Sequence, residues 1–468
     1  MTRRTALAWA ATSTRLVVGA ALAAGIVLVV GIGVAAPWPT REQEPVAVAV
    51  VPTPADTVLA CAGPLMVLAR DSSEAGGLTE AAPSVVVSGS AGEPLDASLL
   101  GTNPAVAGGE GPAVLVAPPQ GDRRSDAVAA GSSAVDAEDL RGLAASACRA
   151  PLIESWLVGG ATTTGAADLI LLANPSDVAA TVDLTLYGAT GASVPPGGTA
   201  LRVDAHSQRI VPLAGLGVGE GAPVVRVTAS GAPVAAALQS NITRTLLPGG
   251  VDQVGPVVGA EPTVVIPGVR VLPTAVEAAP SGSTTLLRLL SAGVDTSVTV
   301  TAVDADGREV LRQEAPVLAD VPSEIDLAGL EAGVYSVAVE ADDPVAAAVW
   351  QTTGLGEGAD FAWYTPAPVL SAETLVAVPE GPDPRIMFVG TGAAAGQVVL
   401  EPLRGGAAAR ATVAANGAAV VSVDAGTVYR LTTEQPIRAG VTFAADGALA
   451  GFPVWAAESA AAEITVYP

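Results

Sequence analysis

Residues 169–191 read LILLANPSDVAATVDLTLYGATG. An apolar run is followed by a polar turn at 174–176, and residues 182–186 then alternate between apolar and polar side chains before a glycine-bounded turn. Alternation with a period of two, bounded by Gly, Pro and Asn, predicts β-strands. Residues 224–240, VVRVTASGAPVAAALQS, predict two more strands on either side of a turn at 231–233.

This pattern occurs three times along the chain. Both parts return together at 286–307 with 334–351, and again at 385–406 with 428–443. Pro233, Pro344 and Pro436 then mark equivalent turns. A period of roughly 100 residues built from short strands indicates tandem β-domains rather than a solenoid of short repeats. We therefore predict β repeats over 151–260, 261–370 and 371–468.

The composition favours a particular kind of repeat. Aromatic residues make up 3% of the chain, so Ala and Val must fill the cores, and β-branched residues favour sheets. Repeats of this length with six or seven strands are typical of immunoglobulin-like β-sandwiches. The last residues, 463–468, look like a fourth opening strand without a repeat behind it. They either complete the third repeat or close a ring, so the prediction is all-β tandem sandwiches, with a closed propeller-like array as the alternative.

The N-terminus predicts a membrane anchor. Residues 16–36 form an uncharged apolar run of 21 residues, which is long enough to cross a bilayer as a helix. Arg3, Arg4 and Arg15 precede it, so the positive-inside rule places residues 1–15 in the cytoplasm. A cleaved signal peptide is the alternative, although Pro37 makes cleavage after Ala36 unfavourable.

The remaining chain is then extracellular. We predict a stalk over 37–57 and a loop-rich segment over 58–150 that carries Cys61 and Cys148, the two cysteines of the chain. An even cysteine count in an exported protein indicates a disulfide. A redox or metal site lacks both a CxxC spacing and a nearby His. Residues 136–148 fit either a helix or an edge strand.

The charge and motif content exclude several functions. A net charge of −24 without a basic cluster argues against nucleic-acid binding and fits an acidic exported surface. The single histidine, His206, lies in a turn, and the chain has no G-x-S-x-G motif. Residues 304–307, DADG, resemble the start of a calcium loop but lack its later ligands, which leaves a hairpin turn. We expect no catalytic, cofactor-binding or metal-binding residues.

One aromatic pair stands out as a candidate ligand patch. Trp363 and Tyr364 lie in a connector rich in Gly and Pro, where they would face a sugar or a protein partner. Trp350, by contrast, lies on a strand of small residues and is expected in the core.

Several strings resemble an actinobacterial family of exported, N-terminally anchored proteins known only as a domain of unknown function. They are CAGP from Cys61, LRGLAASAC ending at Cys148, WLVGGATTTG from Trp156, LANPSDVAATVDLTLYG, and GVDQVGP followed by VVIPG. These strings occur in order over residues 58–268, and the third repeat departs most because it lacks the Asn-Pro turn. The resemblance implies a cell-envelope setting and supplies no functional residues.

The function expected from the sequence is therefore a non-enzymatic, single-pass protein of the cell membrane. It would act outside the cell as a scaffold or interaction module, with envelope proteins or cell-wall glycans as partners. The alternative is a glycan-binding accessory factor in envelope polysaccharide assembly. An extracellular hydrolase is a third hypothesis.

Overall fold

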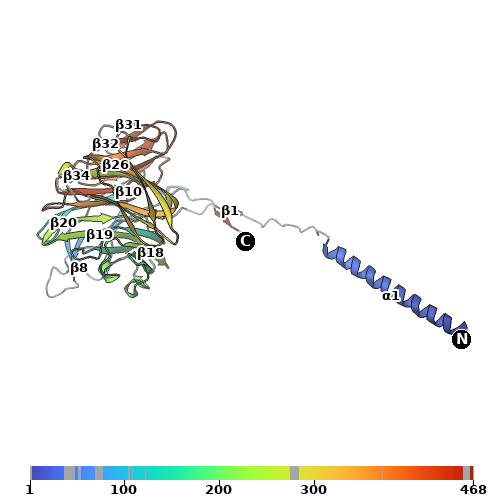
Figure 1. The fold of residues 1–468 in the computed structure, drawn as a ribbon. Coiled ribbons are helices and arrows are strands. Elements are labelled where there is room, and N and C mark those ends of the chain that lie inside the picture. Colours follow the sequence, from blue (N-terminus) through green and yellow to red (C-terminus); the bar gives the residue numbers. More distant parts are fainter. Residues whose placement is uncertain are drawn as a thin grey trace. The chain divides into compact units, whose positions relative to one another are not determined.

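A computed structural model describes most of the chain. The described residues are 3–35, 48–50, 54–68, 77–103, 106–107, 109–121, 123–274, 284–371, 373–456 and 464–466. They divide into two compact units, one formed by the two ends of the chain and the other by residues 53–461. The second unit is built almost entirely of strands, which confirms the predicted all-β class (Figure 1).

The first unit contains the predicted apolar helix. Helix α1 (Arg3–Ala35) includes most of the predicted 16–36 span and also extends through most of residues 1–15. Its segment Thr14–Val34 is long and apolar enough to cross a membrane. None of that segment is buried by protein, so its apolar side chains have no protein partner within the described residues.

The last strand of the chain pairs where neither prediction placed it. Strand β36 (Ile464–Val466) runs antiparallel to β1 (Val48–Val50), with Ala49 opposite Thr465. It therefore neither completes the third repeat nor closes a ring beside the first. No register for this pair could be predicted, because each strand has only three residues.

The first repeat is a two-sheet sandwich. One sheet has the order β12-β18-β14-β15 with β16 beside β14, and the other has the order β20-β19-β13-β17-β7. The strands and short 3-10 helices are β12 (Glu154–Val158), β13 (Leu169–Asn174), β14 (Ala180–Gly188), β15 (Gly191–Ser193), η1 (Pro196–Gly198), β16 (Leu201–Val203), β17 (Ser207–Pro212), η2 (Leu213–Gly215), β18 (Val224–Ser230), β19 (Ala235–Arg244) and β20 (Leu247–Val254).

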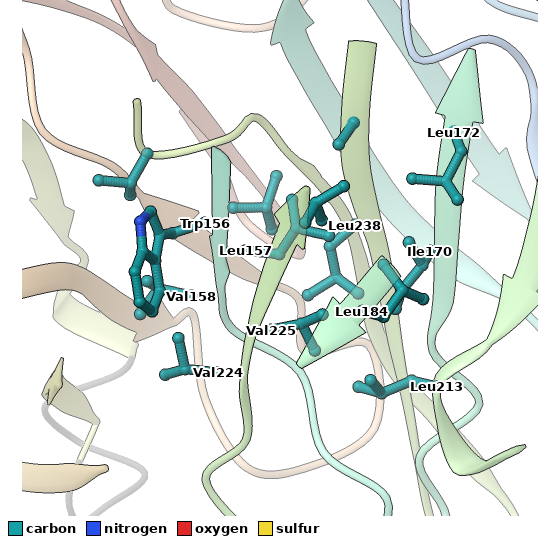
Figure 2. Packing of buried hydrophobic residues seen from close by; sticks show 14 of the residues in the cluster. Trp156, Leu157, Val158, Ile170, Leu172, Leu184, Leu213, Val224, Val225 and Leu238 are labelled. Carbon is teal, nitrogen blue, oxygen red and sulfur yellow. The ribbon is translucent and has the colours of Figure 1, made fainter. Parts of the chain in front are cut away.

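The alternating residues of the first repeat form its core. Leu157 on β12, Leu184 on β14 and Val225 on β18 point from one sheet toward Ile170 and Leu238 on the other (Figure 2). All five are almost completely buried. The predicted turn at 174–176 is fixed by Asn174, whose side-chain oxygen accepts a hydrogen bond from the Ser176 amide at 3.1 Å. This local bond explains why an Asn-Pro-Ser string ends the strand.

The second repeat has the same strand order as the first, but one long strand, β26, takes the place of the two strands β18 and β19. Its sheet has the order β24-β23-β26-β22-β25, and β21 and β27 also pair with β26. Its strands are β21 (Glu261–Val271), β22 (Thr285–Ser291), β23 (Thr296–Val303), β24 (Glu309–Val317), β25 (Ser323–Asp326), β26 (Gly333–Thr352) and β27 (Phe361–Tyr364).

Strand β26 corrects one predicted turn. Pro233 and Pro436 lie in turns between strands, but Pro344 lies inside β26. Ala341 is the last partner of β23 on this strand, and Val345 is the first partner of β22. Pro344 therefore lies where the strand leaves one set of partners for another, and a residue without an N–H costs no ladder bond at such a position.

The third repeat is again a two-sheet sandwich. The orders are β28-β33-β30-β31 and β32-β29-β34-β35. The strands are β28 (Thr374–Val378), β29 (Arg385–Gly390), β30 (Gly396–Pro402), β31 (Ala409–Val413), β32 (Ala418–Ser422), β33 (Thr427–Thr433), β34 (Ile437–Ala445) and β35 (Ala448–Pro453).

The described part of the N-terminal segment is also made of strands. Three small sheets have the orders β11-β10-β5, β2-β9-β6 and β3-β4-β8, while β7 joins the second sheet of the first repeat. The strands are β2 (Thr57–Ala60), β3 (Leu65–Leu68), β4 (Leu78–Ala82), β5 (Val85–Ser90), β6 (Asp96–Leu99), β7 (Gly101–Asn103), β8 (Val106–Ala107), β9 (Ala113–Ala117), β10 (Ala127–Asp136) and β11 (Arg141–Ala147). The helix considered for 136–148 is thus a strand.

The N-terminal segment and the three repeats pack into one body. Strand β11 contacts β20 and β35, and β27 also contacts both of them, so the four blocks form a cycle. Core clusters are shared across the joints; for example, Trp350 of the second repeat packs in the core of the first. The repeats therefore do not form an open row. They do not form a closed propeller either, because the described sheets stay separate sandwich layers.

Candidate functional site

The predicted ligand patch is inside the body. Trp363 and Tyr364 lie on β27, and their exposed fractions are 5% and 1%. The Tyr364 hydroxyl lies 3.5 Å from the Thr442 hydroxyl of the third repeat. The two side chains belong to different cores, because adjacent residues of a strand point to opposite faces. The prediction of an exposed ligand patch at Trp363 and Tyr364 is therefore wrong.

Trp363 does border a small pocket between the first and second repeats. The pocket has a volume of about 180 Å³, and its lining residues are Gly160, Ala161, Gly221, Ser240, Ile242, Leu286, Arg288, Glu324, Trp350 and Trp363. The Arg288 guanidinium lies over the Trp363 ring, 4.6 Å from its centroid. Two indole rings and one carboxylate thus lie next to one opening.

Arg288 mainly holds the two repeats together. Its guanidinium donates to the carbonyl oxygens of Gly160 at 2.8 Å, Pro223 at 3.1 Å and Gly221 at 3.1 Å, all in the first repeat. It also donates to the Glu324 carboxylate at 3.1 and 2.8 Å. These bonds engage both Nη atoms and Nε, so this buried arginine is a structural cross-link rather than a ligand donor.

A buried carboxylate joins all four blocks. Asp360, immediately before β27, accepts backbone N–H bonds from Leu143 at 2.9 Å, Val251 at 3.1 Å and Leu449 at 2.9 Å. These donors lie on β11, β20 and β35, so the N-terminal segment, the first repeat and the third repeat meet at one side chain of the second. We call this arrangement the Asp360 junction.

Two glycines make room for this carboxylate. A Cβ on Gly142 would lie 2.3 Å from an Asp360 oxygen, and one on Gly250 would lie 2.7 Å from it. Both glycines have positive φ, at 141° and 119°. The glycines therefore let two backbones approach the Asp360 side chain closely.

Two further buried carboxylates satisfy backbone amides. Asp252 accepts from the Trp363 amide at 2.7 Å, and Asp168 accepts from Ala161 at 2.6 Å and Asn241 at 2.8 Å. Burial raises the pKa of Asp360 to about 7 and that of Asp168 to about 6, and it raises the pKa of Asp252 well above its ordinary value. Raised pKa values often mark catalytic acids, but these side chains are bound within the core.

The raised pKa values predict that the protein loses stability as the pH rises. Between the unfolded pKa of 3.8 and the folded values near 6 and 7, the folded state holds more protons. The free energy of unfolding should fall by on the order of 4 kcal/mol from pH 5 to pH 8. Urea unfolding at both pH values measures this fall. The pKa values of Asp304 and Asp383 are lowered, so these two groups change the stability only below this pH range. A rise in the free energy of unfolding between pH 5 and pH 8 would contradict the prediction.

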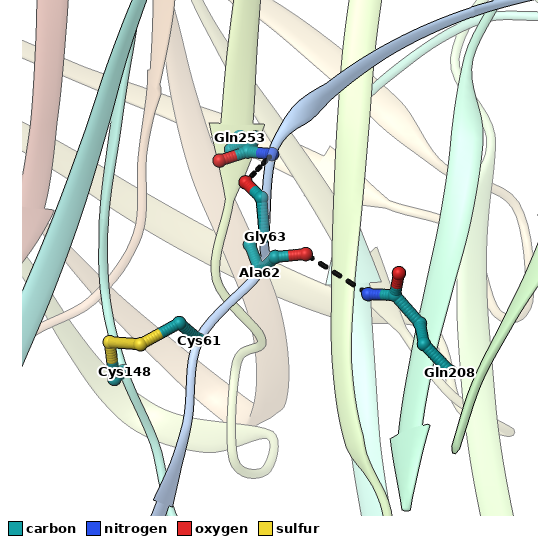
Figure 3. Close-up of a disulfide and its surroundings, with 6 residues drawn as sticks. All are labelled: Cys61, Ala62, Gly63, Cys148, Gln208 and Gln253. Atoms are coloured by element: carbon teal, nitrogen blue, oxygen red, sulfur yellow. Dashed lines mark hydrogen bonds between the residues drawn. A yellow bond between two sulfur atoms is a disulfide. The ribbon is translucent and has the colours of Figure 1, made fainter. Parts of the chain in front are cut away.

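The structure contains the predicted disulfide. Cys61 and Cys148 are joined and both are buried. Next to Cys61, the side chain of Gln208 donates to the Ala62 carbonyl and that of Gln253 donates to the Gly63 carbonyl, each at 3.0 Å (Figure 3). Both glutamines belong to the first repeat and are buried. Disulfide and amides together tie this stretch to β11 and to the first repeat.

A crevice lies beside the disulfide, between the N-terminal segment and the third repeat. Its volume is about 110 Å³. Its walls are mostly Ala, Val and Leu side chains from β2, β10, β11 and β28, and they also include Phe452 and Trp455. Among the described lining residues, the charged side chains are Arg124 and Arg149. We call this feature the Arg149 crevice.

Arg149 and Trp455 form one wall of the crevice. The guanidinium carbon of Arg149 lies 3.3 Å from the centroid of the Trp455 ring. Thr374 on β28 donates through its hydroxyl to the Trp455 carbonyl at 3.4 Å. These residues are far apart in sequence and carry no local motif, so sequence reasoning missed them. Only the contact between segments brings them together.

The other singled-out residues are turn residues. His206 has a φ of 52°, and its Nε2 lies 2.8 Å from the exposed carboxylate of Asp177. Asp304 accepts from the amides of Asp306 and Arg308 at 3.0 and 2.9 Å, which makes the predicted hairpin turn. Within the described residues, no group of His, Cys, Asp and Glu has the arrangement of a metal site.

These features define a disulfide-bonded body of packed β-sandwiches preceded by one apolar helix. The profile of a family of unknown function (DUF5719) matches residues 105–426, which is more than half of the chain. The protein therefore belongs to this family, and the expected resemblance to a family of unknown function is confirmed. The match includes Cys148 but begins after Cys61. No curated protein matches the sequence.

Proposed function

We propose that this protein is a non-enzymatic, membrane-anchored interaction module of the cell envelope, with its β body outside the membrane. The observation that carries the proposal is the apolar segment Thr14–Val34, which is 21 residues long and uncovered by protein. Apart from Arg15 at its start, this segment carries no charge, and an apolar helix of this length is stable in a bilayer because its backbone bonds are internal. Arg3, Arg4 and Arg15 at the N-terminal side of the apolar run favour an outward-facing body.

Two further observations support the proposal. A buried disulfide is typical of oxidising compartments outside the cytoplasm. Three of the four aspartates with a raised pKa, Asp168, Asp252 and Asp360, bind backbone amides, which supports a role in the fold. The fourth, Asp126, is half-buried and belongs to no metal-binding group among the described residues.

Charges placed in the helix should abolish anchoring. Leu22 and Ile26 are 63% and 62% exposed, and arginine at the centre of a spanning helix costs about 2.5–3.5 kcal/mol each. We expect the wild type in the membrane fraction, with its body digested by protease added to intact cells. A Leu22→Arg, Ile26→Arg variant should leave that fraction, and the matched Leu22→Val, Ile26→Val variant should stay. Mature protein beginning after residue 36 would indicate a cleaved signal and overturn the anchor.

The pocket between the first and second repeats favours a second candidate, a glycan-binding accessory factor. Trp350 and Trp363 line it with Glu324, and ligand pockets are typically lined by aromatic side chains with a few polar groups. Saturable binding of wall glycan fragments to the full chain, lost in a Glu324→Gln variant whose urea unfolding matches that of the wild type, would support this function. Binding that survives this substitution would place the glycan elsewhere.

A further inference from the structure

The pocket between the first and second repeats has an aromatic wall, and we call it the Trp350 pocket. Trp350 on β26 lies directly opposite Trp363 on β27, and Leu286 on β22 lies opposite Trp350 on the other side. Residues that are directly opposite on neighbouring strands point to the same face of the sheet. The three side chains therefore form one apolar row, and all three line the pocket. The first repeat supplies the remaining wall, with Gly160, Ala161, Gly221, Ser240 and Ile242.

The polar side chains of the Trp350 pocket leave one acceptor for a ligand. Arg288 has five N–H groups and donates five hydrogen bonds, three to backbone carbonyls and two to Glu324. Both bonds to Glu324 reach Oε1, and no described residue donates to Oε2. The Glu324 side chain is 34% exposed, so Oε2 accepts hydrogen bonds from a molecule that enters the pocket.

The charges around the pocket disfavour an anionic ligand. The Arg288 guanidinium is paired with Glu324 at 2.8 Å. Two more carboxylates lie close by: Asp168 acts on the charge of Arg288, and Asp326 lies opposite Leu286 on β25. One paired cation therefore lies among three carboxylates, on a chain whose net charge is −24. A negatively charged ligand would be repelled from such surroundings.

The complementary ligand is neutral and has both an apolar face and hydroxyl groups. A cationic ligand would lie next to the guanidinium of Arg288, which is already 4.6 Å from the centroid of the Trp363 ring. A pyranose ring presents C–H groups to an apolar wall, while its hydroxyls donate to a carboxylate oxygen such as Oε2 of Glu324.

The size of the Trp350 pocket limits the ligand to one unit. An engineered cavity of about 150 Å³ holds one benzene molecule. The Trp350 pocket, at about 180 Å³, is only slightly larger, so it accommodates one sugar ring rather than a row of them. A unit at the end of a glycan inserts its ring freely, whereas a unit inside the glycan carries neighbours on both sides.

We propose that the Trp350 pocket binds one neutral sugar unit at the end of an envelope glycan. The ring lies against the apolar row of Trp350, Trp363 and Leu286, and a hydroxyl donates to Glu324. This inference rests on the glycan-binding function proposed above as the second candidate. It specifies the part of the glycan that is bound and its charge.

Binding is measured with the full-length chain in lipid nanodiscs by saturation-transfer NMR. The probes are the neutral methyl glycosides of glucose, galactose, mannose and N-acetylglucosamine. We expect at least one of them to bind with a dissociation constant on the order of 1 mM, which is typical of a ligand this small. Methyl glucuronide, which carries a carboxylate, should bind at least about tenfold more weakly than the neutral glycoside that binds best.

Two glycines provide matched variants. Gly221 lines the pocket, whereas Gly215 does not, and both are exposed. A Cβ at either position would meet no atom within 4 Å, and neither glycine has a positive φ. Gly221→Leu should fill the opening and weaken binding by at least about tenfold, while Gly215→Leu should leave it unchanged. Urea unfolding verifies that both variants fold.

Several outcomes would overturn the inference. If none of the neutral glycosides binds, the pocket is not a sugar site, and unchanged binding in Gly221→Leu would place the sugar elsewhere. Tighter binding of methyl glucuronide or of glucosamine would assign the pocket to a charged ligand. Wall glycan fragments that bind when no single glycoside does would keep the glycan-binding function and remove the end-unit pocket, so the two failures are distinguishable.

Discussion

Replacing Asp360 by alanine should unfold the body or come close to it. The carboxylate accepts three backbone N–H bonds, from Leu143, Val251 and Leu449. Each donor left unpaired in the interior costs about 1–3 kcal/mol, so the free energy of unfolding should fall by about 3–9 kcal/mol. That range is comparable to the whole stability of a typical domain. Urea unfolding followed by tryptophan fluorescence measures the loss.

Two variants show whether the hydrogen bonds cause this loss. Asp360→Asn keeps the shape but offers one acceptor oxygen, while the donors reach both carboxylate oxygens, so it should also destabilise strongly. Asp446→Ala changes an exposed carboxylate at a nearby hairpin tip and should alter the stability by less than about 0.5 kcal/mol. An Asp360→Asn protein as stable as the wild type would disprove the acceptor role.

Removing the disulfide should have the second large effect. Cys61 and Cys148 are separated by 87 positions, and the chain-entropy model assigns about 4–5 kcal/mol to closing a loop of this length. We expect the double serine variant, Cys61→Ser with Cys148→Ser, to unfold at a much lower urea concentration. Reduction of the wild type should lower its midpoint to a similar value.

The location of the disulfide makes this effect easy to test. Both cysteines are buried, so dithiothreitol should act slowly on the folded protein and quickly in urea. The hydrogen bonds from Gln208 and Gln253 to the residues after Cys61 remain in the double serine variant. If they hold this stretch in place without the disulfide, the loss of stability will be smaller. A midpoint unchanged by either treatment would show that the bond adds nothing to stability.

The strand content and the repeats were predictable because they depend on local patterns. Alternation at 182–186 gave β14, and the Asn-Pro-Ser turn gave the end of β13. The disulfide followed from the cysteine count alone. The prediction of a turn at Pro344 was wrong because a proline at a change of strand partners has the same local sequence as a proline in a turn.

The site was not predictable because its contacts are long-range. Trp363 and Tyr364 lie in a stretch with a loop-like composition, but β20 and β35 cover their strand. Arg149 and Trp455 meet only after the first and last blocks pack together. Asp360 showed no motif, since its partners come from three other blocks. Sequence patterns report on residues that are close together in the chain. The residues of these sites are far apart in the chain and come together only in the folded structure.

The Asp360 junction also constrains when the body can form during synthesis. Leu143 precedes Asp360 by 217 positions, and Leu449 follows it by 89. A chain that stops before β35 therefore lacks one of the three backbone donors to Asp360. The junction can form its full set of hydrogen bonds only when residues from all four blocks are present, so the body is expected to fold as one cooperative unit rather than repeat by repeat.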